Sequence, residues 1–333
     1  MTDDSPDLSF VVIGYNEGAH IRACLESVRA IRLPGARYEI LYVDGGSQDN
    51  SLTEARSVPG VRVLGGDKRR RAAENRNLGA AHARGKYIQF IDGDMYLDPE
   101  WPALAMAFLD LRPDVAVVSG ALEEANTSFF FRVLQIDWNP REGEVDTCGG
   151  AAMYRRDVFE KAGRFPEDVS TGEEPLLCWR IRNETAHKVW YLAKRMAKHD
   201  LGFRGLGDYW KRCTTTGRAY IEIASRCWNT SDPFWKPNVL RNFAWAGAYL
   251  ILLATLIVAP LWLKIGLIGL IGLILIRLTI RTWRKGHSLP IAVGYAVHCY
   301  AAKIPLAWGQ LKWFLLIQNP KSKIQNSPPP PSI

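Results

Sequence analysis

The chain has 333 residues, enough for one large domain with an appendage, and 47% of them are hydrophobic. Its formal net charge of +8 is unevenly distributed. Residues 1–242 contain 33 of the 42 basic side chains and all 34 acidic ones, whereas residues 243–333 contain nine Lys and Arg and no Asp or Glu. This imbalance excludes a uniformly basic nucleic-acid-binding protein, so no nucleic-acid partner is expected.

Apolar runs and helical segments alternate over the first 120 residues. Runs such as LSFVVIG and YEILYVD are almost entirely apolar, which is typical of strands buried on both faces, and helical segments separate them. This order predicts an α/β fold with a mostly parallel, Rossmann-like sheet. The expected strands are 8–14, 38–44, 61–64, 86–92 and 115–120, and the expected helices are 17–30, 47–57, 70–84 and 99–111.

Polar and acidic residues follow three of the expected strands. The carboxyl ends of parallel strands meet at one edge of a sheet, where ligands bind, so we expect these residues to line one crevice. Asp92 and Asp94 carry like charges one residue apart, and the alternative interpretation of this pair is a polar turn that ends a strand. The residues are Tyr15, Asn16 and Glu17 after the first strand, Asp44 after the second, and Asp92 and Asp94 after the fourth.

A crevice of carboxylates repels phosphate unless a metal ion lies between them. Mg²⁺ or Mn²⁺ binds a few carboxylates and completes its shell with phosphate oxygens of a substrate. Asp44 could accept hydrogen bonds from a base or ribose, and the spacing of Asp92 and Asp94 suits one carboxylate on a ribose hydroxyl and the other on the metal. The first loop lacks both the GxGxxG and the GxxxxGK[ST] patterns, so neither a nicotinamide cofactor nor a Walker-type site is indicated.

The C-terminal part contains a long apolar run. From Phe243 to Ile276 the only charged residue is Lys264, so we expect two transmembrane helices at about 243–260 and 263–280. Arg277, Arg281, Arg284 and Lys285 follow directly, and the positive-inside rule places them, together with the preceding domain, in the cytoplasm at the inner (plasma) membrane. The alternative is a buried helical hairpin of a soluble protein.

The remaining C-terminal segments are less regular. Residues 291–317 are apolar but interrupted by polar residues, which suggests an interfacial helix or helix pair, with a third crossing as the alternative. The Pro-rich tail 318–333 is expected to be disordered. No signal peptide is expected before the first strand, and the six Cys form no CxxC pair, which argues against a zinc site and is typical of a reducing compartment.

Four strings in the chain resemble glycosyltransferase family 2, whose members have the GT-A fold: VVIGYNE, ILYVDGGSQDNS, RAAENRNLGAAHARGKYIQFIDGDM and GEEPLLCWRIR. The resemblance covers about residues 8–220 and is closest to membrane-anchored bacterial-type members. Together with the apolar run and the positive-inside rule, it predicts a cytoplasmic transferase domain at 1–225, a linker at 226–242 and a membrane region at 243–317. It also implies an inverting transfer from a nucleoside-diphosphate sugar.

The resemblance also implies roles for individual residues. Tyr15, Asn16, Glu17 and Asp44 would hold the nucleotide base and ribose, and Arg71 would contact the nucleotide. Within the DxD pair, Asp92 would contact the nucleotide sugar or the metal, and Asp94 would be the main ligand of Mn²⁺ or Mg²⁺.

On the acceptor side, the resemblance places the general base in the GEEP string. Glu174 occupies the position of the base and Glu173 is the alternative; two exposed acids at a helix N-terminus would be the non-catalytic interpretation. Gly149 and Gly150 would allow close backbone approach to the acceptor. His199 would lie near the metal or the diphosphate, with a purely structural histidine as the alternative. Three basic residues of the following segment would clamp the diphosphate, meet anionic lipid or form a solvated basic face: Lys211, Arg212 and Arg218.

The QxxRW motif of processive family members is absent, so transfer of a single sugar is favoured over polymerisation. An anchored active site suits an acceptor at the membrane surface, such as a lipid-linked saccharide or a glycolipid in polysaccharide synthesis. The alternatives are transfer to polyprenyl phosphate and a non-catalytic membrane scaffold with a transferase-like fold. The sequence identifies neither the sugar nor the nucleotide.

Overall fold

The computed structural model describes residues 5–124, 126–199, 203 and 205–318. These form two compact units. The first unit comprises the residues up to 126 with 137–167 and 173–201, and the second comprises 127–136, 168–172 and the residues from 202 onward. The predicted disordered tail lies outside the described residues except for Gln318, at which the last helix ends.

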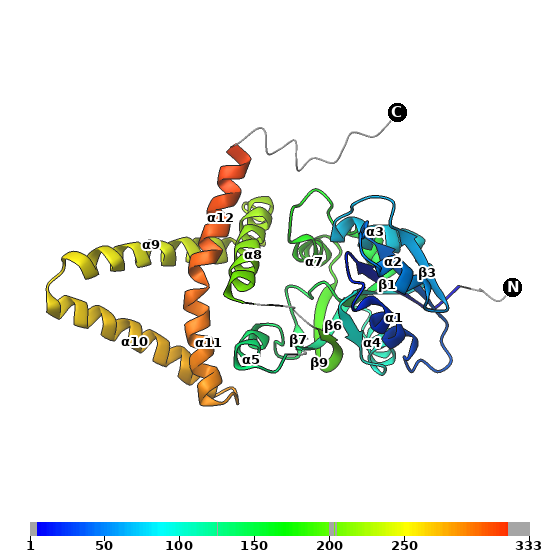
Figure 1. Cartoon of the computed structure of the whole chain (residues 1–333), viewed down its shortest axis with the longest axis horizontal. Helices are drawn as coiled ribbons and strands as arrows, with labels where there is room; N and C mark the ends of the chain where they lie inside the picture. The colour runs from blue at the N-terminus through cyan, green and yellow to red at the C-terminus, as the bar shows by residue number, and fades with distance from the viewer. Residues whose placement is uncertain (1–4, 125, 200–202, 204, 319–333) are drawn as a thin grey trace. The chain divides into compact units, whose positions relative to one another are not determined.

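A nine-stranded mixed sheet organises the first unit (Figure 1). Its order is β3-β2-β1-β4-β8-β6-β9-β5, with β7 paired to β9. The predicted strands are present, and β1, β2, β3 and β4 pair in parallel. The strands are β1 Leu8–Gly14, β2 Tyr38–Asp44, β3 Val61–Gly65, β4 Tyr87–Asp92, β5 Met95–Leu97, β6 Val115–Glu124, β7 Gly143–Glu144, β8 Ala152–Arg155 and β9 Lys188–His199.

Helices cover both faces of this sheet. Along β1, Phe10 and Val12 belong to one hydrophobic cluster with α1, whereas Val11 and Ile13 belong to a second cluster that contains Ala73 and Ala80 of α3. This double burial explains why the parallel strands are apolar throughout. The helices of the first unit are α1 Ile21–Arg29, α2 Ser51–Arg56, α3 Ala72–His82, α4 Trp101–Leu111, α6 Arg156–Lys161 and α7 Glu173–Glu184, and η1 spans Gln135–Asp137 across the unit boundary.

Two helices begin later than the sequence predicts. The first was expected from residue 17 and the second from residue 47, but α1 begins at Ile21 and α2 at Ser51. The intervening residues form loops instead, because Asn16 has a φ of 57° and the backbone N–H of Glu17 donates to Ser51 Oγ at 2.8 Å. These loops lie at the carboxyl ends of β1 and β2.

The second unit is helical and contains two helices that are long and apolar enough to cross a membrane, α9 and α10. They form a hairpin with its turn at Ala259 and Pro260, and the sequence predicted the pair with ends within seven residues of those observed (Figure 1). The segment 291–317 forms a helix pair, one of the predicted arrangements. The helices are α5 Phe129–Leu134, α8 Leu206–Cys227, α9 Lys236–Val258, α10 Leu261–Trp283, α11 Leu289–Ala301 and α12 Lys303–Gln318.

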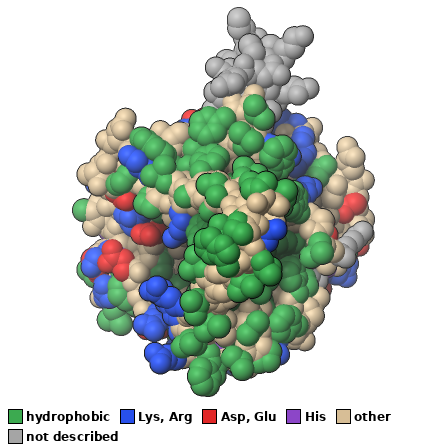
Figure 2. Space-filling view, turned by 90° about the vertical axis from the view of Figure 1, so that its left-hand side faces the viewer, with side chains coloured by type: hydrophobic (Ala, Val, Ile, Leu, Met, Phe, Trp, Pro, Cys, Tyr) green, Lys and Arg blue, Asp and Glu red, His purple; other side chains and the backbone are tan. Residues whose placement is uncertain are grey.

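The hairpin exposes its apolar side chains. Figure 2 looks onto this end of the molecule and shows hydrophobic side chains across the centre of the view. Such a large exposed apolar surface is typical of membrane contact. Exposed residues on the two helices include Leu250, Ile251, Leu253, Ile257, Leu261, Trp262, Ile265 and Ile268.

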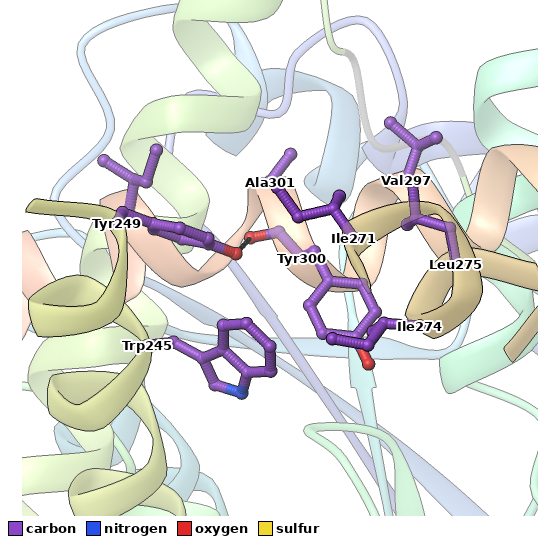
Figure 3. A pocket seen from close by; sticks show the side chains of 9 residues that line it. Trp245, Tyr249, Ile271, Ile274, Leu275, Val297, Tyr300 and Ala301 are labelled. Carbon is purple, nitrogen blue, oxygen red and sulfur yellow. Dashed lines mark hydrogen bonds between the residues drawn. The ribbon is translucent and has the colours of Figure 1, made fainter. Parts of the chain in front are cut away.

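Helices α11 and α12 pack against the rest of the second unit. The backbones of α8 and α12 approach closely at two glycines, since a Cβ on Gly217 would lie 2.0 Å from the Leu306 carbonyl oxygen and one on Gly309 would lie 2.0 Å from that of Thr214. Beside them, an apolar hollow is lined by α9, α10, α11 and the start of α12 (Figure 3). In it, the Tyr249 hydroxyl donates to the Tyr300 carbonyl oxygen at 2.9 Å.

Candidate active site

A polar pocket lies at the carboxyl edge of the parallel strands, within the first unit. Its wall comes from the loops after β1 and β4, the segment before α3 and the first turns of α3. The pocket therefore occupies the position that the sheet topology predicts for a ligand. Its lining residues are Ile13, Gly14, Tyr15, Glu17, Arg69, Arg70, Ala72, Asn75, Arg76, Asp92, Gly93 and Asp94.

The loop after β1 is fixed to the loop after β2 by Asn16. The backbone N–H of Asn16 donates to Ser47 Oγ, and its side-chain oxygen accepts from the N–H of Gln48, both at 2.9 Å. The preceding Tyr15 lies in the pocket wall with its ring 3.5 Å from the guanidinium carbon of Arg69, a cation–π contact. Asn16 thus orders the loop, while Tyr15 and Glu17 face the pocket.

Asp44 is fully buried at the end of β2. Its carboxylate accepts four hydrogen bonds, from the Tyr42 hydroxyl, the Gly46 N–H, and both the N–H and the hydroxyl of Ser47, at 2.6–3.0 Å. A carboxylate has about four acceptor positions, so these four donors occupy nearly all of them. Asp44 therefore stabilises the turn that follows β2. A bound ribose or base would have to share the carboxylate oxygens with these donors.

Asp92, at the end of β4, is paired with a buried arginine that the sequence analysis did not single out. Arg76 Nη2 lies 2.7 Å from Asp92 Oδ1, and Arg76 Nη1 lies 3.0 Å from Glu173 Oε1. The Arg76 side chain is only 5% exposed; burial opposes its charge, but the two carboxylates raise the pKa of this arginine above its ordinary value. A signal was present in the sequence, because Arg76 shares a helix face with the small residues Ala73 and Ala80 that pack on the sheet.

The next carboxylate, Asp94, has one oxygen that is not satisfied. Oδ2 lies 3.3 Å from His199 Nε2, whereas Oδ1 is buried and has no hydrogen-bond partner among the described residues. Burial opposes the charge of His199, but the hydrogen bond to Asp94 and its charge raise the pKa of the imidazole. A buried, unpaired carboxylate oxygen beside an imidazole is a donor set that suits a divalent cation.

Glu17 adds a third carboxylate to this end of the pocket. Burial, and then the charges of Asp94 and Asp92, raise the pKa of Glu17 from 4.5 to about 7. Burial is the larger cause, and the neighbouring charges add to it because like charges disfavour ionisation of Glu17. The residues present therefore fit the predicted Mn²⁺ or Mg²⁺, which would relieve this repulsion.

The basic residues at the pocket differ from the one that the sequence predicted. Arg69 and Arg70 line the pocket. The Arg71 side chain instead donates to the Glu167 carbonyl oxygen at 2.5 Å and pairs with Glu74, so it is engaged at the start of α3. Arg212 lies on α8 in the second unit, and its predicted contact with the donor stays a prediction.

Glu173 and Glu174 open α7, as the sequence predicted, and point to different partners. Glu173 pairs with Arg76, whereas Glu174 is buried and its Oε1 accepts from the Cys148 N–H at 2.7 Å and from the Cys178 thiol at 2.9 Å. Burial raises the pKa of Glu174. Neither glutamate lines the pocket itself, but Glu173 reaches it through Arg76.

The segment that contains Cys148 also approaches the DxD pair. A Cβ on Gly150 would lie 2.6 Å from Arg76 Nη2 and 3.1 Å from Asp92 Oδ2, so only glycine fits here without displacement. The preceding Gly149 has a φ of +79°, which also favours glycine. The two glycines that the sequence singled out therefore bring the backbone against the Asp92–Arg76 pair.

Known proteins resemble this chain in sequence and in fold. Residues 9–163 match the sequence family described as glycosyl transferase family 2. The chain is 32% identical over 236 residues to the glycosyltransferase AglE of Haloferax volcanii, which corresponds to 67% of this chain and 76% of that protein.

Two solved structures show the fold. The mannosyltransferase PcManGT from Pyrobaculum calidifontis, in complex with GDP-Man and Mn²⁺, is similar with a TM-score of 0.70 at 18% identity, over 93% of this chain and 88% of that chain. The S. aureus TarS 1–349 fragment, in complex with UDP-GlcNAc, is similar with a TM-score of 0.50 at 19% identity, over 67% of each chain. These likenesses confirm the predicted fold class.

Proposed function

The chain belongs to glycosyl transferase family 2, and we propose that it moves a sugar, with inversion at the anomeric carbon, from a nucleoside-diphosphate sugar to an acceptor at a membrane surface. The observation that carries the proposal is the pocket at the carboxyl edge of the sheet, where a buried oxygen of Asp94 has no hydrogen-bond partner within the described part of the chain. Solved structures of similar fold contain GDP-Man or UDP-GlcNAc, which supports a nucleotide-sugar donor.

Asp94, Asp92 and His199 would hold the Mn²⁺ or Mg²⁺ ion. When bound, the ion supplies positive charge that stabilises the diphosphate leaving group. Tyr15, Asn16, Glu17 and Asp44 would contribute to the donor site: Tyr15 and Glu17 line the pocket, and Asn16 and Asp44 shape its loops.

The basic side chains of the pocket would bind the donor phosphates. Arg69 and Arg70 face the pocket from the segment before α3, so they are better placed in this structure than Arg71. Arg76 holds Asp92 in a fixed orientation and neutralises part of its charge. Arg212 would act from α8 if the second unit brings it to the donor.

Glu174 would accept the proton of the acceptor hydroxyl as this oxygen attacks the anomeric carbon. Its raised pKa favours this role, because a general base works best when its pKa lies nearer the working pH. Glu173 would act as a positioning residue through its ion pair with Arg76. A neutral amide at position 174 could not take the proton, whereas one at 173 would only weaken the pairing.

The anchor supports a membrane-associated acceptor. Helices α9 and α10 are apolar enough to span a bilayer, and Arg277, Arg281, Arg284 and Lys285 follow the apolar part of α10. By the positive-inside rule these charges stay in the cytoplasm, as would the transferase domain. A lipid-linked saccharide or a glycolipid at the inner membrane is the acceptor that this topology favours.

The test compares Glu174→Gln with Glu173→Gln in the full chain in detergent, with Mn²⁺ or Mg²⁺ and a panel of nucleotide sugars. We expect Glu174→Gln to lose about 10²–10⁴-fold in turnover with nucleotide affinity nearly unchanged, and Glu173→Gln to lose less. The reverse order would move the base to residue 173, and two active variants would exclude both. The anomeric configuration of the product, measured by NMR, tests inversion, and retention would refute it.

A further inference from the structure

Two cysteines that are far apart in the sequence meet at the Glu174 carboxylate. Cys148 precedes Gly149 in the loop after β7, and Cys178 lies one turn after Glu174 on α7. Their sulfur atoms are 3.5 Å apart, and the Glu174 Oε1 atom lies 3.3 Å from Cys148 Sγ and 2.9 Å from Cys178 Sγ. Three potential metal ligands therefore form one triangle.

Burial and chemistry distinguish this triangle from the DxD pair. Cys178 is fully buried and Glu174 is 7% exposed, whereas Cys148 is only partly buried. Two sulfur donors with one oxygen suit a soft or borderline ion such as Zn²⁺, while carboxylates suit Mg²⁺ or Mn²⁺. The spacing of Glu174 and Cys178 at i and i+4 holds two of the ligands on one helix face.

The dimensions of the triangle are close to those of a zinc site. Tetrahedral zinc, with bonds of about 2.3 Å to sulfur and about 2.1 Å to oxygen, holds its ligand atoms about 3.6–3.8 Å apart. The observed separations of 3.5, 3.3 and 2.9 Å are shorter by up to roughly 0.7 Å, because hydrogen bonds now join the atoms. The largest difference lies between Glu174 and Cys178, so the Glu174 carboxylate would have to turn on its side chain, together with a small outward movement of Cys148 on its loop, to open the triangle.

We propose that Cys148, Cys178 and Glu174 form a binding site for a thiophilic divalent ion of the Zn²⁺ class, distinct from the Mn²⁺ or Mg²⁺ site at Asp94. Three protein ligands leave the fourth position to water, as in open zinc sites. Because the sequence contains no CxxC pair, it predicts no zinc site. The fold supplies the pairing instead, by placing the loop before β8 against α7.

The protonation of the thiols makes the site selective. The Cys148 and Cys178 thiols must each lose a proton before their sulfur atoms can ligate an ion as thiolates. A bound ion must displace these protons, and only an ion with strong thiolate affinity can do so. Mg²⁺ and Mn²⁺ should therefore leave this site empty at concentrations that fill the carboxylate site.

Occupancy would affect turnover through Glu174. A carboxylate that ligates Zn²⁺ cannot accept the proton of an acceptor hydroxyl, so the ion would inhibit transfer. This consequence, unlike the binding itself, rests on the proposed function. Measuring binding and turnover separately therefore distinguishes a failure of the site from a failure of the proposed base.

The binding test uses Co²⁺ as a spectroscopic substitute for Zn²⁺. The full chain in detergent, with its thiols kept reduced by a phosphine and with saturating Mg²⁺, is titrated with Co²⁺. We expect a thiolate-to-cobalt charge-transfer band that saturates at one ion per chain and is abolished by added Zn²⁺. The band should be lost in Cys148→Ala and Cys178→Ala and retained in Cys213→Ala, a matched control because Cys213 is also a buried thiol.

A second measurement needs no substitution. Alkylation of Cys148 by iodoacetamide, followed by peptide mass spectrometry, should slow at least tenfold with Zn²⁺ and be unaffected by Mg²⁺. Absence of the thiolate band in the wild-type chain, its persistence in Cys178→Ala, or equal alkylation with and without Zn²⁺ would each overturn the proposal. If binding is observed and Zn²⁺ leaves turnover unchanged, the site stands and Glu174 is not the base.

Discussion

Replacing Arg76 with methionine should destabilise the first unit more than the loss of any exposed ion pair. Arg76 is 5% exposed and joins Asp92 and Glu173 at 2.7 and 3.0 Å. Methionine fills a similar volume but leaves both carboxylates without their cation. They would face each other and the remaining acids of the pocket, among them Glu17, whose pKa already reflects repulsion.

The size of the expected loss in the free energy of unfolding follows from the burial of Arg76, Asp92 and Glu173. Removal of one partner from a buried pair costs about 3–5 kcal/mol. Because the side chains of Asp92 and Glu173 are 32% and 21% exposed, water can partly solvate them, and we expect about 3 kcal/mol, at the lower end of that range. For a unit of this size, that loss lowers the melting temperature by roughly 6–12 °C.

The assay is thermal unfolding of the purified full chain, followed by tryptophan fluorescence with EDTA and with Mn²⁺. Mn²⁺ should restore part of the loss, because it replaces the missing positive charge. The matched control is Arg32→Met: Arg32 also lies 3.0 Å from a glutamate, Glu100, but both side chains are more than 70% exposed, so the change should cost less than about 1 kcal/mol. Equal melting temperatures for the two variants would refute the structural role of Arg76.

Three further outcomes are expected. Asp94→Asn should reduce Mn²⁺-dependent nucleoside-diphosphate release to below about a tenth of wild type while unfolding stays near normal, since an amide cannot hold the ion; activity above that level would exclude the metal role. A chain truncated after Asn242 should no longer sediment with membranes, because the apolar run and the excess positive charge lie beyond it; salt-resistant sedimentation would place the anchor elsewhere. In EDTA, the pKa of Glu17 in the folded protein is about 7, above its ordinary 4.5. The contribution of Glu17 to the free energy of unfolding is therefore fully present below pH 4.5 and is lost as the pH rises through 7. Allowing for the partial exposure of Glu17, the Glu17→Gln variant should lack about 1 kcal/mol of this change in stability with pH. If the variant and the wild type show the same dependence of stability on pH, the raised pKa of Glu17 is contradicted.

The parallel half of the sheet was predictable because its signal is local. β1, β2 and β4 are mostly apolar runs, and the polar residues at their carboxyl ends are adjacent to them in the sequence. The apolar hairpin of α9 and α10 was predictable for the same reason, since a stretch long and apolar enough to cross a bilayer is continuous in the sequence. Helix starts were less predictable, because Asn16 and Asp44 use their side chains to hold loops where helical periodicity alone predicts helix.

Long-range pairing was not visible in the sequence. His199 reaches Asp94 because β5 and β9 pair with Met95 opposite His199, and only the resemblance to the family suggested that histidine. Arg76 shares a helix face with small residues, but only the packing of α3 on the sheet brings it to Asp92 and Glu173. Cys148 and Cys178 are 30 residues apart, and only the position of α7 brings their thiols together.

Three aspartates at the strand ends look equivalent in the sequence but lie in different environments. Asp44 accepts four hydrogen bonds from Tyr42 and the turn after β2, and Asp92 shares the charge of Arg76 with Glu173. Asp94 is left with a buried oxygen that has no partner among the described residues. Because an unpaired buried carboxylate is the most costly of the three arrangements, a cation gains most by binding there. We therefore expect the loss of metal affinity to be larger for Asp94→Asn than for Asp92→Asn, and Asp44→Asn to act through the conformation of its loop.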